Sequence, residues 1–102
     1  MGALVNTQST AETPIALFRI GRIVATPNAL ESLSQSDILA GLQRHQAGDW
    51  GDVSDHDRQA NDRAIEKGAR VVSVYQSANR VKFWIITEAD RRTTTVLLPQ
   101  DY

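Results

Sequence analysis

The chain has 102 residues and no cysteine, and its 11 basic and 12 acidic residues give a formal net charge of -1 at pH 7. This length fits one domain with one modest core. The lack of cysteine excludes disulfides, thiolate catalysis and thiolate metal sites, and the near-neutral charge argues against non-specific nucleic-acid binding. No apolar run reaches the length of a membrane span and no signal peptide is visible, so a cytoplasmic protein is expected.

The first third of the chain predicts a tail, a strand and a short helix. Residues 1–13 are small and polar without periodicity, which predicts a flexible tail before a single domain over residues 14–102. Residues 15–25 are rich in β-branched and aromatic side chains and predict a strand. A helix is expected to follow, with Thr26 as its N-cap and Pro27 in its first turn.

Two further helices are predicted in the middle of the chain. The first is expected to be capped at residues 36–37 and to end at Gly48. The second is expected to begin with a cap at residues 54–57 and to end at Gly68. Their apolar faces are predicted from six side chains, which are Ile38, Leu39, Leu42, Ala60, Ala64 and Ile65.

From residue 70 onward the hydrophobic period becomes two. Strands are predicted over 70–76, 81–87 and 93–98, with tight turns at 77–79 and 88–91. Two consecutive short connections require antiparallel pairing, so these strands form a meander. Together with the first strand, they predict an α+β fold, in which a four-stranded antiparallel sheet in the order β-α-α-α-β-β-β carries helices packed on one face.

Three residues are candidates for catalysis: His45, Glu88 and Arg91. His45 falls on or beside the apolar stripe at the end of its helix, where it is either a general base or ligand tuned by partial burial, or a histidine that helps to terminate the helix. Glu88 and Arg91 share a turn, and with a histidine they match the residue types of a metal-independent ribonuclease. The alternative is an exposed ion pair of little energetic value. The structural interpretation is favoured in both cases.

Five residues are candidates for binding: Asp49, Trp50, Asn61, Tyr75 and Trp84. The loop around Trp50 is either a packing anchor or a recognition loop, and packing is slightly favoured. Asn61 is expected at the margin of the apolar face, where a buried amide must be hydrogen-bonded. Tyr75 is placed near the strand that contains Trp84, and that tryptophan is a candidate for an exposed aromatic patch.

An acidic run from Asp49 to Asp57 offers oxygen ligands of the kind that hard divalent metals prefer. Its spacing does not follow a calcium loop, and helix capping explains two of its aspartates. Neither a metal nor a cofactor is therefore expected.

Residues from about Ile15 to Tyr102 resemble a family of small, mostly uncharacterised proteins of plasmids, phages and other mobile elements. The resemblance covers nearly the whole chain outside the tail. It rests on the segments GRIVATP (21–27), RHQ (44–46), GDWGD (48–52), WIITEADR (84–91) and TT (94–95), and on Asn61, Arg70, Ser73, Tyr75, Pro99 and Tyr102. Relatives often have a glycine-containing turn where this chain has residues 77–79, and many have serine in place of Arg92.

The resemblance implies an accessory gene on mobile DNA that deals with host defence or plasmid maintenance. Some relatives carry a restriction-subunit label, but this chain has no methyltransferase or nuclease motif to support that role.

The sequence is compatible with three functions. The first is a non-enzymatic accessory protein of a mobile element that binds a protein partner, with a homodimer left open. The alternative is a small metal-independent ribonuclease-like or RNA-binding domain that uses the sheet face. A basic patch from the strand residues Arg19, Arg22, Arg70, Arg80 and Lys82 would be needed for the RNA-binding function. A DNA-binding regulator is disfavoured, because the third helix carries four acidic residues.

Overall fold

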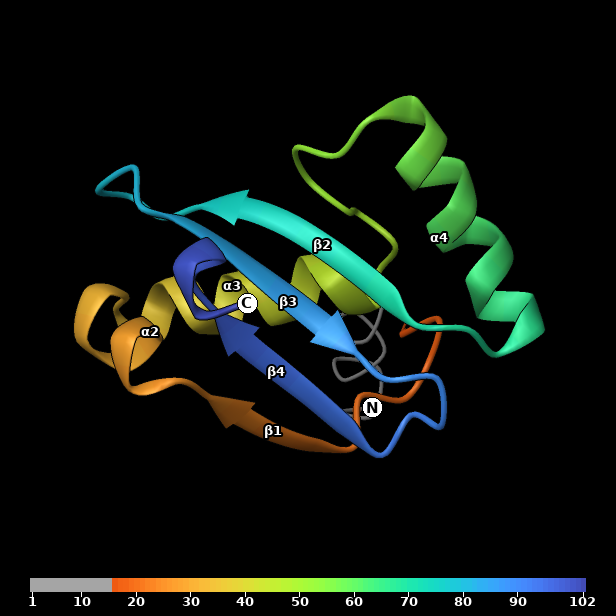
Figure 1. Ribbon diagram of the computed structural model, residues 1–102, viewed down its shortest axis with the longest axis horizontal. Coiled ribbons are helices and arrows are strands. Elements are labelled where there is room, and N and C mark those ends of the chain that lie inside the picture. Colours follow the sequence, from red (N-terminus) through yellow and green to blue (C-terminus); the bar gives the residue numbers. More distant parts are fainter. Residues whose placement is uncertain (1–15) are drawn as a thin grey trace, which may run out of the picture.

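A mixed sheet organises the fold. The structure is a computed structural model that describes residues 16–102, so the predicted tail at residues 1–13 lies outside the described residues (Figure 1). The strands are β1 (Arg22–Ala25), β2 (Val71–Gln76), β3 (Lys82–Thr87) and β4 (Thr93–Leu97). The helices are α2 (Pro27–Ser32), α3 (Gln35–Gln46), α4 (Asp55–Lys67) and the 3-10 turn η1 (Pro99–Asp101).

The strand order is β1-β4-β3-β2. The predicted meander of β2, β3 and β4 is confirmed, with antiparallel pairing throughout. The prediction of a wholly antiparallel sheet is wrong, because β1 pairs in parallel with β4, in the register Arg22↔Thr93 to Ala25↔Val96. Tight turns dictate antiparallel pairing only between successive strands, whereas three helices separate β1 from the meander. The α+β class is confirmed in this mixed form.

The helices begin and end largely where their capping residues predict. The Thr26 side chain accepts a hydrogen bond from the Ala29 N–H at the start of α2. The α3 cap is Ser34, two residues before the predicted position, and Asp37 completes its capping box. Gly68 ends α4 in the left-handed conformation. No helix in residues 16–102 is long and apolar enough to cross a membrane.

The core lies between the sheet and α3. Phe83 and Ile85 face Gly41 of α3, where even a methyl group would lie 3.0 Å from both side chains. The expected placement of all helices on one face is wrong for α4. This helix lies along the outer edge of β2, because the Asn61 side chain hydrogen-bonds to the backbone of Val72.

The two edges of the sheet are treated differently. At the β2 edge, the Asn61 amide donates to the Val72 carbonyl at 2.8 Å and its oxygen accepts from the Val72 N–H at 3.1 Å. The segment before α4 closes the next position, because the Val74 N–H donates to the Trp50 carbonyl and the Asp52 N–H to the Val74 carbonyl. Natural sheets protect their edges in such ways. The β1 edge has no such cover within the described residues.

Candidate functional site

His45 lies at the centre of a buried polar chain between α3 and the sheet. Its side chain has no exposed surface. Nδ1 lies 2.6 Å from the Ser73 hydroxyl on β2, and Nε2 lies 2.9 Å from the Thr87 hydroxyl on β3. Thr87 in turn lies 2.6 Å from the hydroxyl of Thr94 on β4. One histidine thus connects a helix to three strands.

The directions of the hydrogen bonds around His45 follow from the carbonyl group of Ile20, at which the series of side-chain hydrogen bonds ends. The Thr94 hydroxyl donates to the Ile20 carbonyl at 2.7 Å, and that carbonyl can only accept. Thr94 must therefore accept from Thr87, and the Thr87 oxygen accepts from the Nε2–H of His45. The Ser73 hydroxyl then donates to Nδ1. The network assigns a neutral His45 with its proton on Nε2.

Aromatic rings enclose the histidine on its remaining sides. Phe18 and Trp50 meet the imidazole edge-on, with centroid separations of 5.2 Å and 5.7 Å. The Arg91 guanidinium lies 5.4 Å from the Phe18 ring centroid. Burial, and then the positive charge of Arg91, lower the pKa of His45 to about 4 from its ordinary 6.5. His45 is therefore neutral and inaccessible, which does not suit a general base.

This buried imidazole predicts a loss of stability in mild acid. Between pH 6.5 and about 4 the unfolded chain binds a proton at His45 that the folded chain does not. The free energy of unfolding should thus fall by up to about 1.4 kcal/mol per pH unit as the pH drops through this window. Urea denaturation across the window measures the slope. His45→Gln should reduce this slope, and His56→Gln should leave it unchanged. Equal slopes in wild type and both variants would contradict the assignment of the slope to His45.

The structure does not join the three catalytic candidates in an open cleft. Arg91 donates to the backbone carbonyls of Ala69 and Glu88 at 2.7 Å and 3.1 Å, and to that of Ala64 at 3.0 Å. It therefore fastens the β3–β4 turn to the C-terminal end of α4. Glu88 lies in the exposed turn, while His45 lies beneath Phe18. The histidine that a ribonuclease-like site would need is thus fully buried, whereas the Glu88 side chain is exposed.

Asp49 and Tyr75 hold the loop after α3 against the sheet. The Asp49 carboxylate accepts from Arg44 at 2.7 Å and 3.2 Å, and this contact lowers the pKa of Asp49. The Tyr75 hydroxyl donates to the Asp49 carbonyl at 2.6 Å, and burial raises the pKa of Tyr75 to about 12. The Arg44 guanidinium lies 4.5 Å from the Tyr75 ring centroid. These contacts join α3, the loop and β2, and the side chain of Asp49 is 55% exposed.

Trp50 is a packing residue in the structure. It is 2% exposed, and its indole N–H donates to the Asp62 carboxylate of α4 at 2.9 Å. The ring stacks on Phe18 with a centroid separation of 5.9 Å. Trp50 therefore links the loop, the N-terminal segment and α4.

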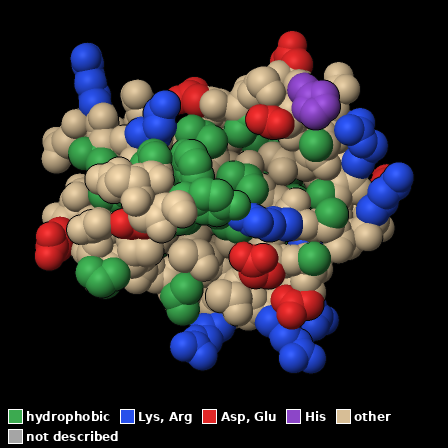
Figure 2. All heavy atoms as spheres, viewed as in Figure 1, with side chains coloured by type: hydrophobic (Ala, Val, Ile, Leu, Met, Phe, Trp, Pro, Cys, Tyr) green, Lys and Arg blue, Asp and Glu red, His purple; other side chains and the backbone are tan. Residues whose placement is uncertain are grey.

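Trp84 has a different environment. It lies on the face of the sheet turned away from α3 and lines a groove of about 320 Å³ between the sheet and α4. We call this the Trp84 groove; its lining residues are Val53, Asp57, Ala60, Asn61, Val72, Val74 and Trp84. Figure 2 shows this face, where hydrophobic side chains gather at the centre among scattered charges. Of the five predicted binding residues, Asn61 and Trp84 meet at one accessible surface.

A second aromatic residue adjoins the groove. Tyr102 meets Trp84 edge-on with a centroid separation of 5.4 Å. Arg70 donates to the Tyr102 hydroxyl at 2.6 Å, and its guanidinium lies 5.5 Å from the ring centroid. The open sheet face thus combines two aromatic rings with one cation.

The basic residues of the strands do not form a single patch. Arg80 and Lys82 lie at the β2–β3 turn, whereas Arg22 and Arg70 lie at the opposite end of the sheet, as the strand register requires. In the described part of the chain, no group of three or more histidine, aspartate or glutamate side chains is placed to hold a metal ion.

Sequence reasoning missed the hydroxyl chain beside His45. A serine in the middle of an apolar strand, Val-Val-Ser-Val-Tyr, and three consecutive threonines at 93–95 were the available signals. Polar residues at inward positions of a strand require buried partners, and a histidine on the covering helix supplies one.

Comparisons of the chain with protein-family models, with curated proteins and with solved structures found no match.

Proposed function

We propose that this protein is a non-enzymatic accessory protein that acts by binding a protein partner through the Trp84 groove. The observation that carries the proposal is a half-buried tryptophan at an open, mainly apolar groove. Tryptophan is enriched among the residues that dominate binding energy at protein interfaces. The resemblance to proteins of mobile elements supplies the expected context, namely an accessory role on mobile DNA.

The composition of the groove favours a protein over a small polar ligand. Val72, Val74 and Ala60 form apolar walls on a strand and a helix, and Asp57 provides one charge at the margin. An apolar centre with a polar rim is the usual anatomy of a protein interface. The groove therefore suits a large apolar side chain of a partner, which would pack against the Trp84 indole.

The buried state of His45 supports a non-enzymatic role. Among the three catalytic candidates it is the only group whose ordinary pKa lies near neutrality, and it has no exposed surface. The hydrogen bonds of Arg91 are directed to backbone carbonyls. These contacts support the proposal of a non-enzymatic role.

A matched pair of variants on α4 tests the proposal. Ala60→Arg places a long side chain in the groove, whereas Gln59→Arg adds the same charge at an exposed neighbouring position. Capture from the native host should yield a protein that wild type and Gln59→Arg bind and that Ala60→Arg binds at least about tenfold more weakly. Circular dichroism checks that both variants fold. Equal capture by all three proteins would contradict the role of the groove.

The cation and two rings on the same face favour RNA as a second candidate. Bases stack on exposed aromatic side chains, and arginine adds cation–π contacts. Arg70, Tyr102 and Trp84 provide these groups, although Asp57 and Asp101 lie on elements that border the face. Fluorescence anisotropy with a single-stranded RNA oligonucleotide separates the candidates. Binding that Tyr102→Ala and Arg70→Ala abolish, without any captured protein, would replace the first proposal.

A further inference from the structure

Within residues 16–102, β1 has an outer edge without a strand partner, and its backbone groups follow a specific pattern. The Arg22 N–H donates to the Arg92 carbonyl at 2.9 Å and the Thr26 N–H to the Val96 carbonyl at 3.0 Å, so these residues turn their backbone groups inward to β4. Alternation along the strand turns the N–H and C=O groups of Ile23 and Ala25 outward. The β2 edge, by contrast, is closed by Asn61 and by the segment around Gly51.

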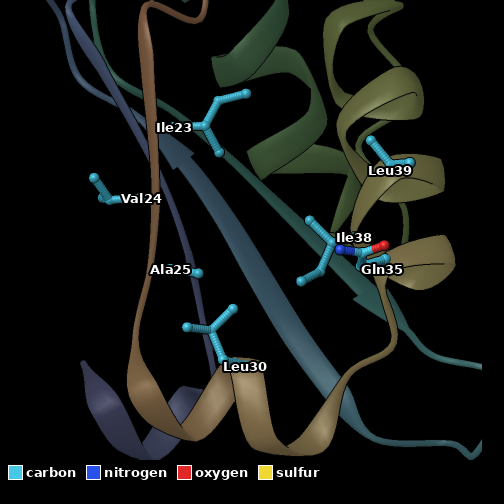
Figure 3. A pocket seen from close by; sticks show the side chains of 7 residues that line it. All are labelled: Ile23, Val24, Ala25, Leu30, Gln35, Ile38 and Leu39. Carbon is cyan, nitrogen blue, oxygen red and sulfur yellow. The ribbon is translucent and has the colours of Figure 1, made fainter.

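An apolar groove of about 450 Å³ accompanies this edge (Figure 3). It lies between β1 and the helices α2 and α3. Ile23, Leu30 and Leu39 line it, and they are 46%, 61% and 60% exposed. Figure 3 shows Ile23 pointing toward the α3 side of β1 and Val24 pointing away from it. Leu39 was predicted to belong to the buried stripe of its helix, and its exposure is therefore a correction to that prediction.

We propose that this edge and groove pair with a second copy of the chain, through antiparallel β1–β1 contact about a two-fold axis at Val24. The outward backbone groups permit this register, because Ile23 then forms a hydrogen-bonded pair with the partner's Ala25, and Ala25 with the partner's Ile23. A large side chain thereby lies beside a small one. Val24 lies opposite its own copy, on the other face of the sheet.

Charge complementarity favours a second copy as the occupant. Within this register Arg22 lies opposite the partner's Thr26. Thr26 donates to the Asp101 carboxylate at 2.6 Å, so an acidic group lies at that end of β1. Antiparallel pairing thus brings the cationic end of each β1 toward the anionic end of the other, twice by symmetry. The interface is isologous and closed, as in most homodimers.

The full chain tests the proposal through its mass in solution. Sedimentation or light scattering should give twice the 11.3 kDa of one chain at micromolar concentration. Because the chain has no cysteine, Val24→Cys introduces a single thiol at the axis. Facing residues at such a position have Cα atoms about 4.5 Å apart, which suits a disulfide. Val24→Cys should therefore cross-link into dimers faster than Ile23→Cys does.

Two surface variants separate this pairing from other contacts. Arg22→Glu should raise the dimer dissociation constant at least about tenfold, with a smaller effect at high salt. Lys82→Glu, which makes the same charge change at the far end of the sheet, should leave it unchanged. Ile23→Pro removes an outward N–H and should yield monomers that fold normally by circular dichroism.

A monomeric wild-type chain would overturn the proposal. Equal cross-linking of Val24→Cys and Ile23→Cys would overturn the register. If the chain is monomeric and Ile23→Pro loses a partner protein that wild type captures, the groove beside β1 binds that protein and not a second copy of the chain. The Trp84 groove lies between α4 and the other side of the sheet, away from β1. A monomeric wild-type chain would therefore not contradict the proposed function. Equal capture of a partner by Ala60→Arg and wild type would likewise not contradict the dimer.

Discussion

Replacing Gly51 by alanine is expected to lower the free energy of unfolding by about 3–5 kcal/mol. A Cβ atom at this position would overlap the Val74 carbonyl oxygen and lie 2.7 Å from the Tyr75 ring. The residue also has a φ of +76°, which side chains rarely adopt. The segment around Gly51 lies this close to β2 because its neighbours Trp50 and Asp52 hydrogen-bond to the backbone of Val74. Urea denaturation measures the loss.

Gly68→Ala is the matched control for this substitution. Gly68 has a similar φ of +71°, but nothing lies within 4 Å of the position that its Cβ would occupy. Only the cost of the left-handed backbone conformation remains, so the free energy of unfolding is expected to fall by about 1 kcal/mol. Equal losses in the two variants would show that the close contact between Gly51 and β2 is not maintained in solution.

His45→Ala should destabilise the protein by about 4 kcal/mol. The substitution removes the partner of the Ser73 and Thr87 hydroxyls in a fully buried site. It also leaves a cavity between Phe18 and Trp50, because both rings pack on the imidazole. Chemical denaturation at pH 7 gives the change directly, since His45 is neutral there.

The second histidine provides the control. The His56 side chain is 87% exposed, so His56→Ala should change the free energy of unfolding by less than about 0.5 kcal/mol. Thr87→Val should cost less than His45→Ala, because it keeps the volume of the side chain and removes only hydrogen bonds. A His45→Ala variant as stable as His56→Ala would exclude the buried network.

Local signals in the sequence predicted most of the secondary structure. Thr26 and Pro27 start α2, and Gly68 ends α4, because capping depends on residues that are adjacent in the chain. The meander followed from two tight turns. The parallel pairing of β1 did not, because it depends on which edge of the sheet remains free after the helices have packed. No periodicity encodes that choice.

The candidate site was predicted less completely. The structural interpretation of His45 expected a side chain that helps to terminate its helix, whereas the imidazole is fully buried and lies within hydrogen-bond distance of Ser73 and Thr87 on the sheet. The sequence did not reveal the two hydroxyl partners of His45, which are Ser73 on β2 and Thr87 on β3, or the link from Thr87 to Thr94 on β4. Leu39 shows the opposite failure. Its spacing from Leu42 predicts a buried stripe, but the helix faces the sheet with Leu42 and turns Leu39 to the surface. Helical spacing gives a face, and only tertiary packing decides how wide that face is.

Asn61 also limits how far strand pairing can propagate. A sheet with two free edges can add copies without end, whereas a sheet with one free edge is saturated after a single pairing. By occupying the backbone groups of Val72, the Asn61 amide makes β2 a terminator of such growth. Loss of that amide would free the backbone groups of Val72, whereas those of Val74 would stay paired with the segment around Gly51, so the β2 edge would open only in part.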